Sequence, residues 1–241
     1  MLVSSVEQGW KIIYQRAHGL LAAQLANYWQ ISERPPYWPH TLIAIAEHDD
    51  GLAESSTSEN LTESGAPRHF QLLEYSVEQY QNVMEIALSK SRWNALLTSM
   101  HLVFLYKDKK SEDRELSHFL DEQIRLQKVL KKQLKVSHAL AEHSYRLVEW
   151  CDALSLILCM DKVQPEQRRL EISTGPDGTR HQLWRDSKNN LKVEPWPFEE
   201  DTFTVSVEYR IVNQLSFDSV RAFSEAMQKA LVQEDQWTFC R

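Results

Sequence analysis

From residue 112 to residue 162 the chain contains neither of the two helix-breaking residues, glycine and proline. Proline disrupts a helix interior, and glycine costs a helix about 1 kcal/mol relative to alanine. Their absence therefore favours helix over the whole stretch. A single helix of that length is unusual in a globular domain, so we expect two helices in preference to one.

Apolar residues at helical spacing predict further helices before this stretch. Ser4 or Ser5 is the expected N-cap of the first helix, and Gly51 the stop of the second. The proline-rich segment 33–39 forms a rigid connection between them. The predicted helices cover residues 4–30, 40–50, 70–88 and 91–106.

The pattern changes after Pro165, where β-branched and aromatic residues alternate between the turns TGPDGT and KNN. This pattern is typical of three or four antiparallel strands. Ser216 is expected to cap a last helix, and WTFC at 237–240 to form a short strand. We therefore predict an α+β, mainly α fold. A helical core over 1–163 carries the functional site, and a β-rich unit over 164–241 packs on it as part of one compact domain.

Composition restricts the compartment and the partners. Hydrophobic residues make up 42% of the chain, the net charge is -7, and the three cysteines form no CxxC pair. No apolar run approaches the roughly 20 residues of a membrane span, and the N-terminus lacks the basic start of a signal peptide. The negative charge argues against a nucleic-acid partner. We expect a cytoplasmic protein that binds a small molecule and neither nucleic acid nor membrane, with a homo-oligomer left open.

Ionisable side chains occur within or directly after predicted apolar helices at four places in the sequence. His18 lies in YQRAHGLLAAQL, His48 and Asp49 follow LIAIA, His101 interrupts NALLTSMHLVFLY, and Asp152 lies in LVEWCDALSLILCM. A buried carboxylate is paired, protonated or bound to a metal, because burying it alone is costly. Imidazole and carboxylate ligands together suit Mn, Fe, Mg, Co, Ni or Zn. These five residues predict a site for one or two divalent ions between helices.

Each of these residues also has a purely structural explanation. A single buried histidine is more often a hydrogen-bonded core residue than a ligand. His48 and Asp49 fit a solvated helix end, although acidic groups there oppose the helix dipole. Asp152 fits a partner of Arg16 or Arg146. These alternatives stay open for each residue, and it is the combination on four helices that favours a metal.

The order of these residues resembles the H…HD…D pattern of the HD-domain superfamily of metal-dependent phosphohydrolases. His101 looks like the extra ligand of members that hold two metals. The resemblance covers about residues 10–160 and implies an HD-like helical bundle. The strings AEHDDG and CDALSLILC also look similar to an uncharacterised bacterial family with no assigned activity. The residues that match the superfamily pattern in order are His18, His48, Asp49 and Asp152.

The resemblance implies a metal-dependent hydrolase that acts on a small phosphorylated compound or a nucleotide. A bound ion would acidify a water molecule and polarise a phosphoryl oxygen. Glu47 and Asp50 are the candidate catalytic residues, either as a general base or by orienting a ligating imidazole. The candidate substrate-binding residues are Gln15, Arg16, Arg68 and His69.

Two other functions remain open. HD-like bundles also house di-iron oxygenases, which use more histidine ligands, so a further histidine in the site would favour that activity. Leu52 stands where related phosphohydrolases often carry lysine, which favours a non-catalytic ligand-binding or regulatory protein. The polar segment 51–68 starts directly after Asp50 and is predicted to flank the opening of the site as a lid.

Overall fold

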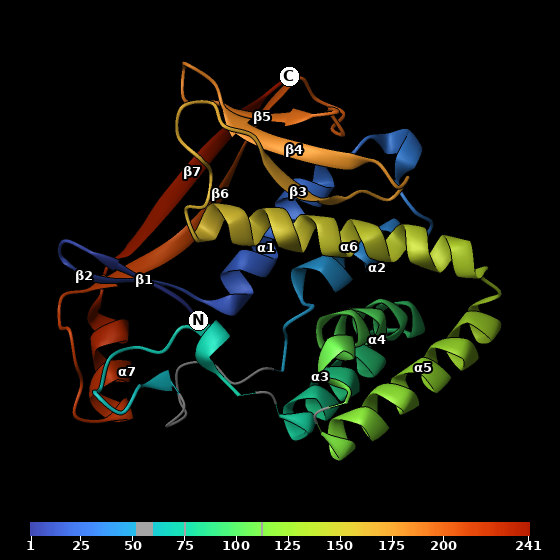
Figure 1. Ribbon diagram of the computed structural model, residues 1–241, viewed down its shortest axis with the longest axis horizontal. Coiled ribbons are helices and arrows are strands. Elements are labelled where there is room, and N and C mark those ends of the chain that lie inside the picture. Colours follow the sequence, from blue (N-terminus) through green and yellow to red (C-terminus); the bar gives the residue numbers. More distant parts are fainter. Residues whose placement is uncertain (52–59, 75, 112) are drawn as a thin grey trace.

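A computed structural model describes residues 1–51, 60–74, 76–111 and 113–241 of the chain. Within these residues, seven strands form one curled mixed sheet in the order β1-β2-β6-β7-β5-β4-β3 (Figure 1). The strands are β1 (Leu2–Val6), β2 (Gly9–Ile13), β3 (Leu170–Thr174), β4 (Arg180–Arg185), β5 (Leu191–Glu194), β6 (Thr202–Val212) and β7 (Val232–Cys240).

The helices form layers on this sheet. Helices α1 and α6 pack against it, α2 and α4 pack against them in turn, and α3 and α5 lie on the side away from the sheet (Figure 1). No helix in the described part of the chain is long and apolar enough to cross a membrane. The α-helices are α1 (Gln15–Asn27), α2 (Trp38–Ala46), α3 (Val77–Lys90), α4 (Arg92–Tyr106), α5 (Arg114–Leu134), α6 (His138–Cys159) and α7 (Val220–Lys229), and the short 3-10 turns are η1 (Ile31–Glu33), η3 (Phe70–Leu72) and η4 (Lys107–Lys109).

This architecture contradicts the predicted fold class. A helical bundle with a small C-terminal antiparallel sheet is wrong, because 49% of the protein is helix and 21% strand, and the strands build one large sheet. Strands β1 and β2 come from the N-terminus, and β2 pairs with β6. The sheet is mixed, because β5 and β7 run parallel while the other neighbouring strands are antiparallel.

The hairpin of β1 and β2 replaces the start of the predicted first helix, so Ser4 and Ser5 are strand residues and not N-caps. Gly9 explains the difference. Its φ of +136° favours glycine, and a Cβ atom there would lie 2.2 Å from the carbonyl oxygen of Val212 in β6. The pairing partner lies near the other end of the chain, so helical periodicity extended backwards from α1 cannot detect it.

The middle of the chain follows the prediction closely. The stretch from 112 to 162 forms two helices, and Lys135 breaks it in the left-handed conformation before Ser137 caps α6. The helix expected at 91–106 is confirmed as α4. The helix expected at 70–88 begins only at Val77, where Ser76 caps it, and a 3-10 turn over Phe70–Leu72 comes before it.

The C-terminal elements are present with shifted boundaries. Four strands follow Pro165 before the last helix, as expected. Ser219, and not Ser216, caps α7 by accepting a hydrogen bond from the backbone N–H of Ala222. Strand β7 begins at Val232, well before the predicted WTFC strand, because it pairs with β6 along most of its length.

The largest cluster of buried apolar side chains contains residues from both sides of the expected boundary at residue 163. Trp29, just after α1, meets Trp150 of α6 edge to face with ring centroids 4.9 Å apart. Both rings also pack edge-on against Phe198, which precedes β6. This aromatic contact fixes α1 and α6 side by side, which sets the spacing of the two helices.

Gly19 allows α1 to approach the end of α2 closely. A Cβ atom at this position would lie 2.3 Å from the carbonyl oxygen of Ala46, the last residue of α2. A side chain of any size would therefore push the two backbones apart. The contact sets the distance between His18, beside Gly19, and His48, just after α2.

We expect Gly19→Ala to destabilise the protein, although alanine is the better helix former. Overpacking against a backbone atom costs about 1–3 kcal/mol, whereas alanine in a helix interior gains about 1 kcal/mol over glycine. The contact would be with a rigid backbone oxygen at 2.3 Å, so we expect a cost in the upper part of this range, about 2–3 kcal/mol, and a net loss of about 1–2 kcal/mol in urea unfolding. Leu20→Ala, at a side chain that is 60% exposed, is the control and should change little. A Gly19→Ala variant as stable as the unchanged protein would contradict the close approach.

Candidate metal centre

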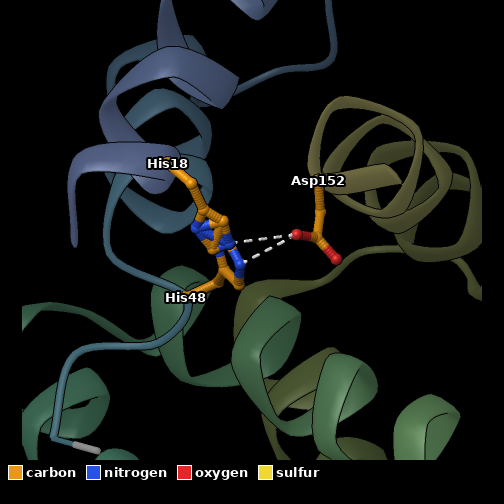
Figure 2. Close-up of side chains that lie close together, drawn as sticks. All are labelled: His18, His48 and Asp152. Carbon is orange, nitrogen blue, oxygen red and sulfur yellow. Dashed lines mark ion pairs between the residues drawn. The ribbon is translucent and has the colours of Figure 1, made fainter. Parts of the chain in front are cut away.

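Four helical elements bring the five predicted ligands together. His18 comes from α1, His48 and Asp49 from the turn after α2, His101 from α4 and Asp152 from α6. The three histidines and Asp152 are buried, with at most 8% of each residue exposed. Figure 2 shows His18 and His48 converging on the carboxylate of Asp152, which points towards them from α6.

The distances between the facing atoms fit a shared ion better than direct hydrogen bonds. Asp152 Oδ1 lies 3.4 Å from His18 Nε2 and 3.2 Å from His48 Nε2, and Asp49 Oδ2 lies 3.6 Å from both nitrogens. Asp152 Oδ2 lies 3.9 Å from His101 Nε2. Two ligands about 2.1 Å from one ion are about 3.0 to 4.2 Å apart, depending on their angle. The observed distances fall within that interval.

The hydrogen bonds around the imidazoles aim their inner nitrogens at the centre. His18 Nδ1 lies 2.8 Å from the carbonyl oxygen of Gln15, and His48 Nδ1 lies 2.8 Å from that of Ile45. A carbonyl only accepts, so each Nδ1 carries a proton, and in the neutral form of the ring Nε2 presents its lone pair to the centre. The same arrangement orients histidine ligands in metal sites. The Ile45 carbonyl is free for this role because it lies in the last turn of α2.

Asp152 Oδ1 is the atom that most clearly lacks a partner. It is buried and makes no hydrogen bond of acceptable geometry. The centre would hold acceptors only, with two carboxylates and the lone pairs of three neutral imidazoles. A buried group of acceptors with two negative charges is costly without a cation. The donor set therefore fits a divalent ion.

The pKa values show how protons compensate the negative charge of the two carboxylates when no ion is bound. Burial lowers the pKa of His48, but Asp49 and Asp152 outweigh it and raise this pKa to about 10. Burial and the charge of His48 lower the pKa of His18 to about 4, and the same two causes lower the pKa of His101. Burial acts to raise the pKa of Asp152, but His48 and the other imidazoles hold it well below its usual range. At neutral pH one proton, on His48, thus takes the place of a cation.

The turn that carries His48 and Asp49 is anchored on α3. Gly51 adopts a φ of +105°, and a Cβ atom there would lie 3.0 Å from the backbone of Val83. Its carbonyl oxygen accepts a hydrogen bond of 2.9 Å from Asn82 Nδ2. The prediction that Gly51 stops the second helix is wrong, because α2 ends at Ala46. Gly51 serves a left-handed turn packed on a neighbouring helix.

The two predicted catalytic carboxylates, Glu47 and Asp50, lie in ion pairs at the rim of the centre. Lys90, at the end of α3, pairs with Glu47 and lies 3.4 Å from Asp50. Arg16 Nε lies 3.4 Å from the other oxygen of Asp50, and its side chain is 62% exposed. These cations also offset the negative charge that collects at the end of α2. The catalytic roles themselves stay predictions.

The predicted substrate-binding residues do not lie together. Gln15 is buried and joins the centre, because its Nε2 donates a hydrogen bond of 2.9 Å to Asp49 Oδ2. Arg16 lies at the rim. His69 is packed against Phe70 and shares a cavity with the end of α6, away from the metal ligands. The backbone N–H of Arg68 donates to the carbonyl oxygen of Asn60.

The sequence analysis missed three kinds of residue near the centre. The hydroxyl of Tyr145 lies 3.4 Å from His101 Nδ1, Lys90 holds the HDD turn, and Tyr80 and Tyr106 lie close enough to Asp49 for its charge to help raise their pKa values, after burial. The sequence pattern predicts that tyrosines in amphipathic helices are core residues and that a lysine at a helix end is exposed to solvent. Only Tyr145 carried a signal, seven residues before Asp152 and so on the same face of α6.

The expected lid, residues 51–68, is only partly described. Leu52 and the rest of 52–59 lie outside the described residues. From Asn60 onwards the segment packs on the region before α7, where Leu61 joins an apolar cluster with Phe217 and the Gly65 carbonyl accepts from the Phe217 N–H. Residues 60–67 are therefore fixed on the C-terminal part of the protein and do not form a lid.

A family model described as "Protein of unknown function (DUF3891)" matches residues 1–214. The chain belongs to this family. No curated protein and no solved structure matches the chain. The expectation of an uncharacterised family is thus confirmed, whereas nothing in these matches links the DUF3891 family to the HD-domain superfamily. The chemistry of the centre has to be argued from its own geometry.

Asp152→Asn separates a metal ligand from a structural carboxylate. The substitution nearly preserves the volume, so the variant should fold and bind Mn²⁺ or Zn²⁺ at least about tenfold more weakly. If Asp152 instead only compensates a buried cation, the main effect should be a stability loss of about 3–5 kcal/mol. Metal content and melting temperature, measured together, distinguish these results. Asp218→Asn, at an exposed carboxylate, is the control. A destabilised Asp152→Asn variant with full metal occupancy would rule out the ligand role.

Metal binding should also displace the proton on His48. At pH 6.0 this imidazole is protonated, because its pKa is raised to about 10, whereas that of His18 is lowered to about 4 and that of His101 is also lowered. Titration with Mn²⁺ should therefore release about one proton per ion. Calorimetry in two buffers of different ionisation enthalpy measures this number. Release of about three protons would show that all three imidazoles are charged, contrary to the lowered pKa values of His18 and His101.

Proposed function

We propose that the protein is a metal-dependent hydrolase of phosphorylated small molecules. The observation that carries the proposal is the buried oxygen of Asp152, which lacks a hydrogen-bond partner and faces the inner nitrogens of His18 and His48. Such a centre supplies Lewis-acid chemistry when a divalent ion is bound. Hydrolysis of a phosphate ester is the reaction that this chemistry and the nearby cations support together.

The ligands support a single ion as the minimum. Two overlapping groups of ligand atoms, His18–His48–Asp152 and His48–Asp49–His101, each lie within 4.8 Å. They share His48, and one imidazole nitrogen binds one ion, so the two groups describe one centre. Asp152 directs Oδ1 towards His18 and His48 and Oδ2 towards His101, so its carboxylate would hold the ion together with these imidazoles.

The surrounding residues would orient the ligands and attract an anion. Gln15 holds Asp49 by a hydrogen bond and His18 through its carbonyl oxygen. Glu47 and Asp50 are both engaged by Lys90, which supports an orienting role for these carboxylates over that of a free general base. Arg16, largely exposed beside Asp50, places a cation at the rim where a phosphate group would approach.

The alternatives from the sequence are less well supported. A di-iron oxygenase calls for further histidines, and in the part of the chain that the structure describes the clustered histidines are His18, His48 and His101. His118 is 69% exposed on α5, and His143 lies near the carbonyl oxygen of Glu33. A non-catalytic metal-binding protein fits the same geometry and is distinguished by turnover alone.

Hydrolysis should depend on the metal and on His48. Protein stripped by a chelator and reloaded separately with Mn, Mg, Zn, Co, Ni or Fe should cleave p-nitrophenyl phosphate with at least one of them. His48→Asn should lower kcat/KM at least about a hundredfold, because it removes a central ligand. His118→Asn is the matched control on an exposed histidine.

Full activity in the presence of the chelator would contradict the proposal. Two bound irons together with oxygen consumption would favour the oxygenase. Stoichiometric metal without turnover of any phosphate ester would favour the binding protein.

A further inference from the structure

A cavity of about 200 Å³ lies beside the metal centre, between the start of α1, the segment that leads into α3 and the end of α4. Gln15 belongs to both, because it lines the cavity and its Nε2 donates to Asp49. Tyr80 and Tyr106 line the cavity as well, and the charge of Asp49 acts on both. The space is therefore next to the ligands and not at a remote surface.

We propose that this cavity binds the non-reacting part of the substrate, and that the substrate is a phosphate monoester smaller than a nucleotide with a hydroxyl or amine group. The inference rests on the proposed function for the binding of the phosphoryl group at the metal centre, and on the cavity for the size and the polar groups of the rest of the substrate. It makes Gln15, Tyr80 and Tyr106 residues that determine specificity.

The size of the cavity favours a small ligand. At the share of about 30 Å³ that a molecule has in liquid water, 200 Å³ holds about seven waters. Pockets for drug-sized ligands measure about 300–1,000 Å³. A short alcohol or amino alcohol fits within this volume, whereas a base and a ribose together would extend beyond it.

The lining explains why the ligand should donate hydrogen bonds. Gln15 is only 5% exposed, and its Oε1 has no hydrogen-bond partner although its Nε2 is used. An unsatisfied buried acceptor costs about 1–3 kcal/mol, and a hydroxyl or ammonium group of a ligand would remove that cost. Tyr80 and Tyr106 pack with ring centroids 4.5 Å apart, and burial raises both pKa values, so both hydroxyls stay protonated. Tyr80 shares a side-chain hydrogen bond with Tyr106, which leaves the Tyr106 hydroxyl as the donor for a ligand oxygen.

A larger cavity of about 400 Å³ between β1, β7 and the end of α6 does not serve the same centre. Its nearest α6 residue, Leu158, is six residues beyond Asp152, or about 9 Å along the helix. Its cations are already engaged, since Lys11 pairs with Asp235 and Arg185 lies 3.9 Å from Asp161. The smaller cavity is the one that the metal ligands adjoin.

The test compares phosphoethanolamine and glycerol phosphate with adenosine monophosphate on the metal-loaded protein. We expect kcat/KM for the two small esters to exceed that for the nucleotide at least about tenfold, because the nucleotide does not fit. Gln79→Trp, which fills the cavity from α3, should weaken binding of the small esters at least about tenfold and leave the metal content unchanged. Gln81→Trp is the matched control, because Gln81 lies on the same helix with its side chain exposed.

Tyr106→Phe provides a second variant in case Gln79→Trp does not fold. Loss of its hydroxyl should raise KM for glycerol phosphate more than it lowers kcat. Saturation-transfer NMR with each ester measures binding independently of turnover. Selective loss of the small-ester signal in Gln79→Trp supports the cavity.

The two proposals fail in different ways. Equal use of adenosine monophosphate, or full small-ester binding by Gln79→Trp, overturns the cavity assignment while metal-dependent hydrolysis stands. Binding of the small esters that Gln79→Trp abolishes, without hydrolysis of any ester, overturns the proposed function and keeps the cavity as a ligand site. Absence of binding by every probe overturns the cavity assignment.

Discussion

The buried carboxylate of Asp152 is the constraint on which the rest of the centre depends. An isolated charge in an apolar helix is costly by several kcal/mol, and the imidazoles of His18, His48 and His101 face this carboxylate from other elements. Without a metal, the proton on His48 compensates part of the charge. A divalent ion compensates all of it, so metal binding and folding are coupled by the same electrostatic term.

Contacts between the helices hold the ligand-bearing side chains in place around Asp152. Trp29 and Trp150 hold α1 beside α6, and Gly19 lets α1 touch the end of α2. The HDD turn is then anchored on α3 through Gly51 and Lys90. The large sheet carries α1 and α6 on one side, so its role in function is to position two of the four ligand-bearing elements.

The polar groups around the metal ligands extend from Asp49 through Gln15 to the adjoining cavity. Gln15 touches the ligands with its carbonyl oxygen and its Nε2, and leaves Oε1 as an unused acceptor. Tyr80 and Tyr106, whose rings pack together, line the same cavity. A single glutamine therefore links the orientation of the metal ligands to the recognition of whatever fills the cavity, and changes at this residue should couple the two.

The sequence by itself determined the helices in the middle of the chain. It also determined the five residues that converge, because an ionisable group in an apolar helix is stable only when it is paired, protonated or bound to a metal. His18, His101 and Asp152 could be picked out for this reason alone. Only the tertiary structure decided the fold class, because β2 pairs with β6 across almost the whole chain and local periodicity carries no record of that pairing. The same holds for Lys90 and Tyr106, whose roles come from the helices that happen to face them.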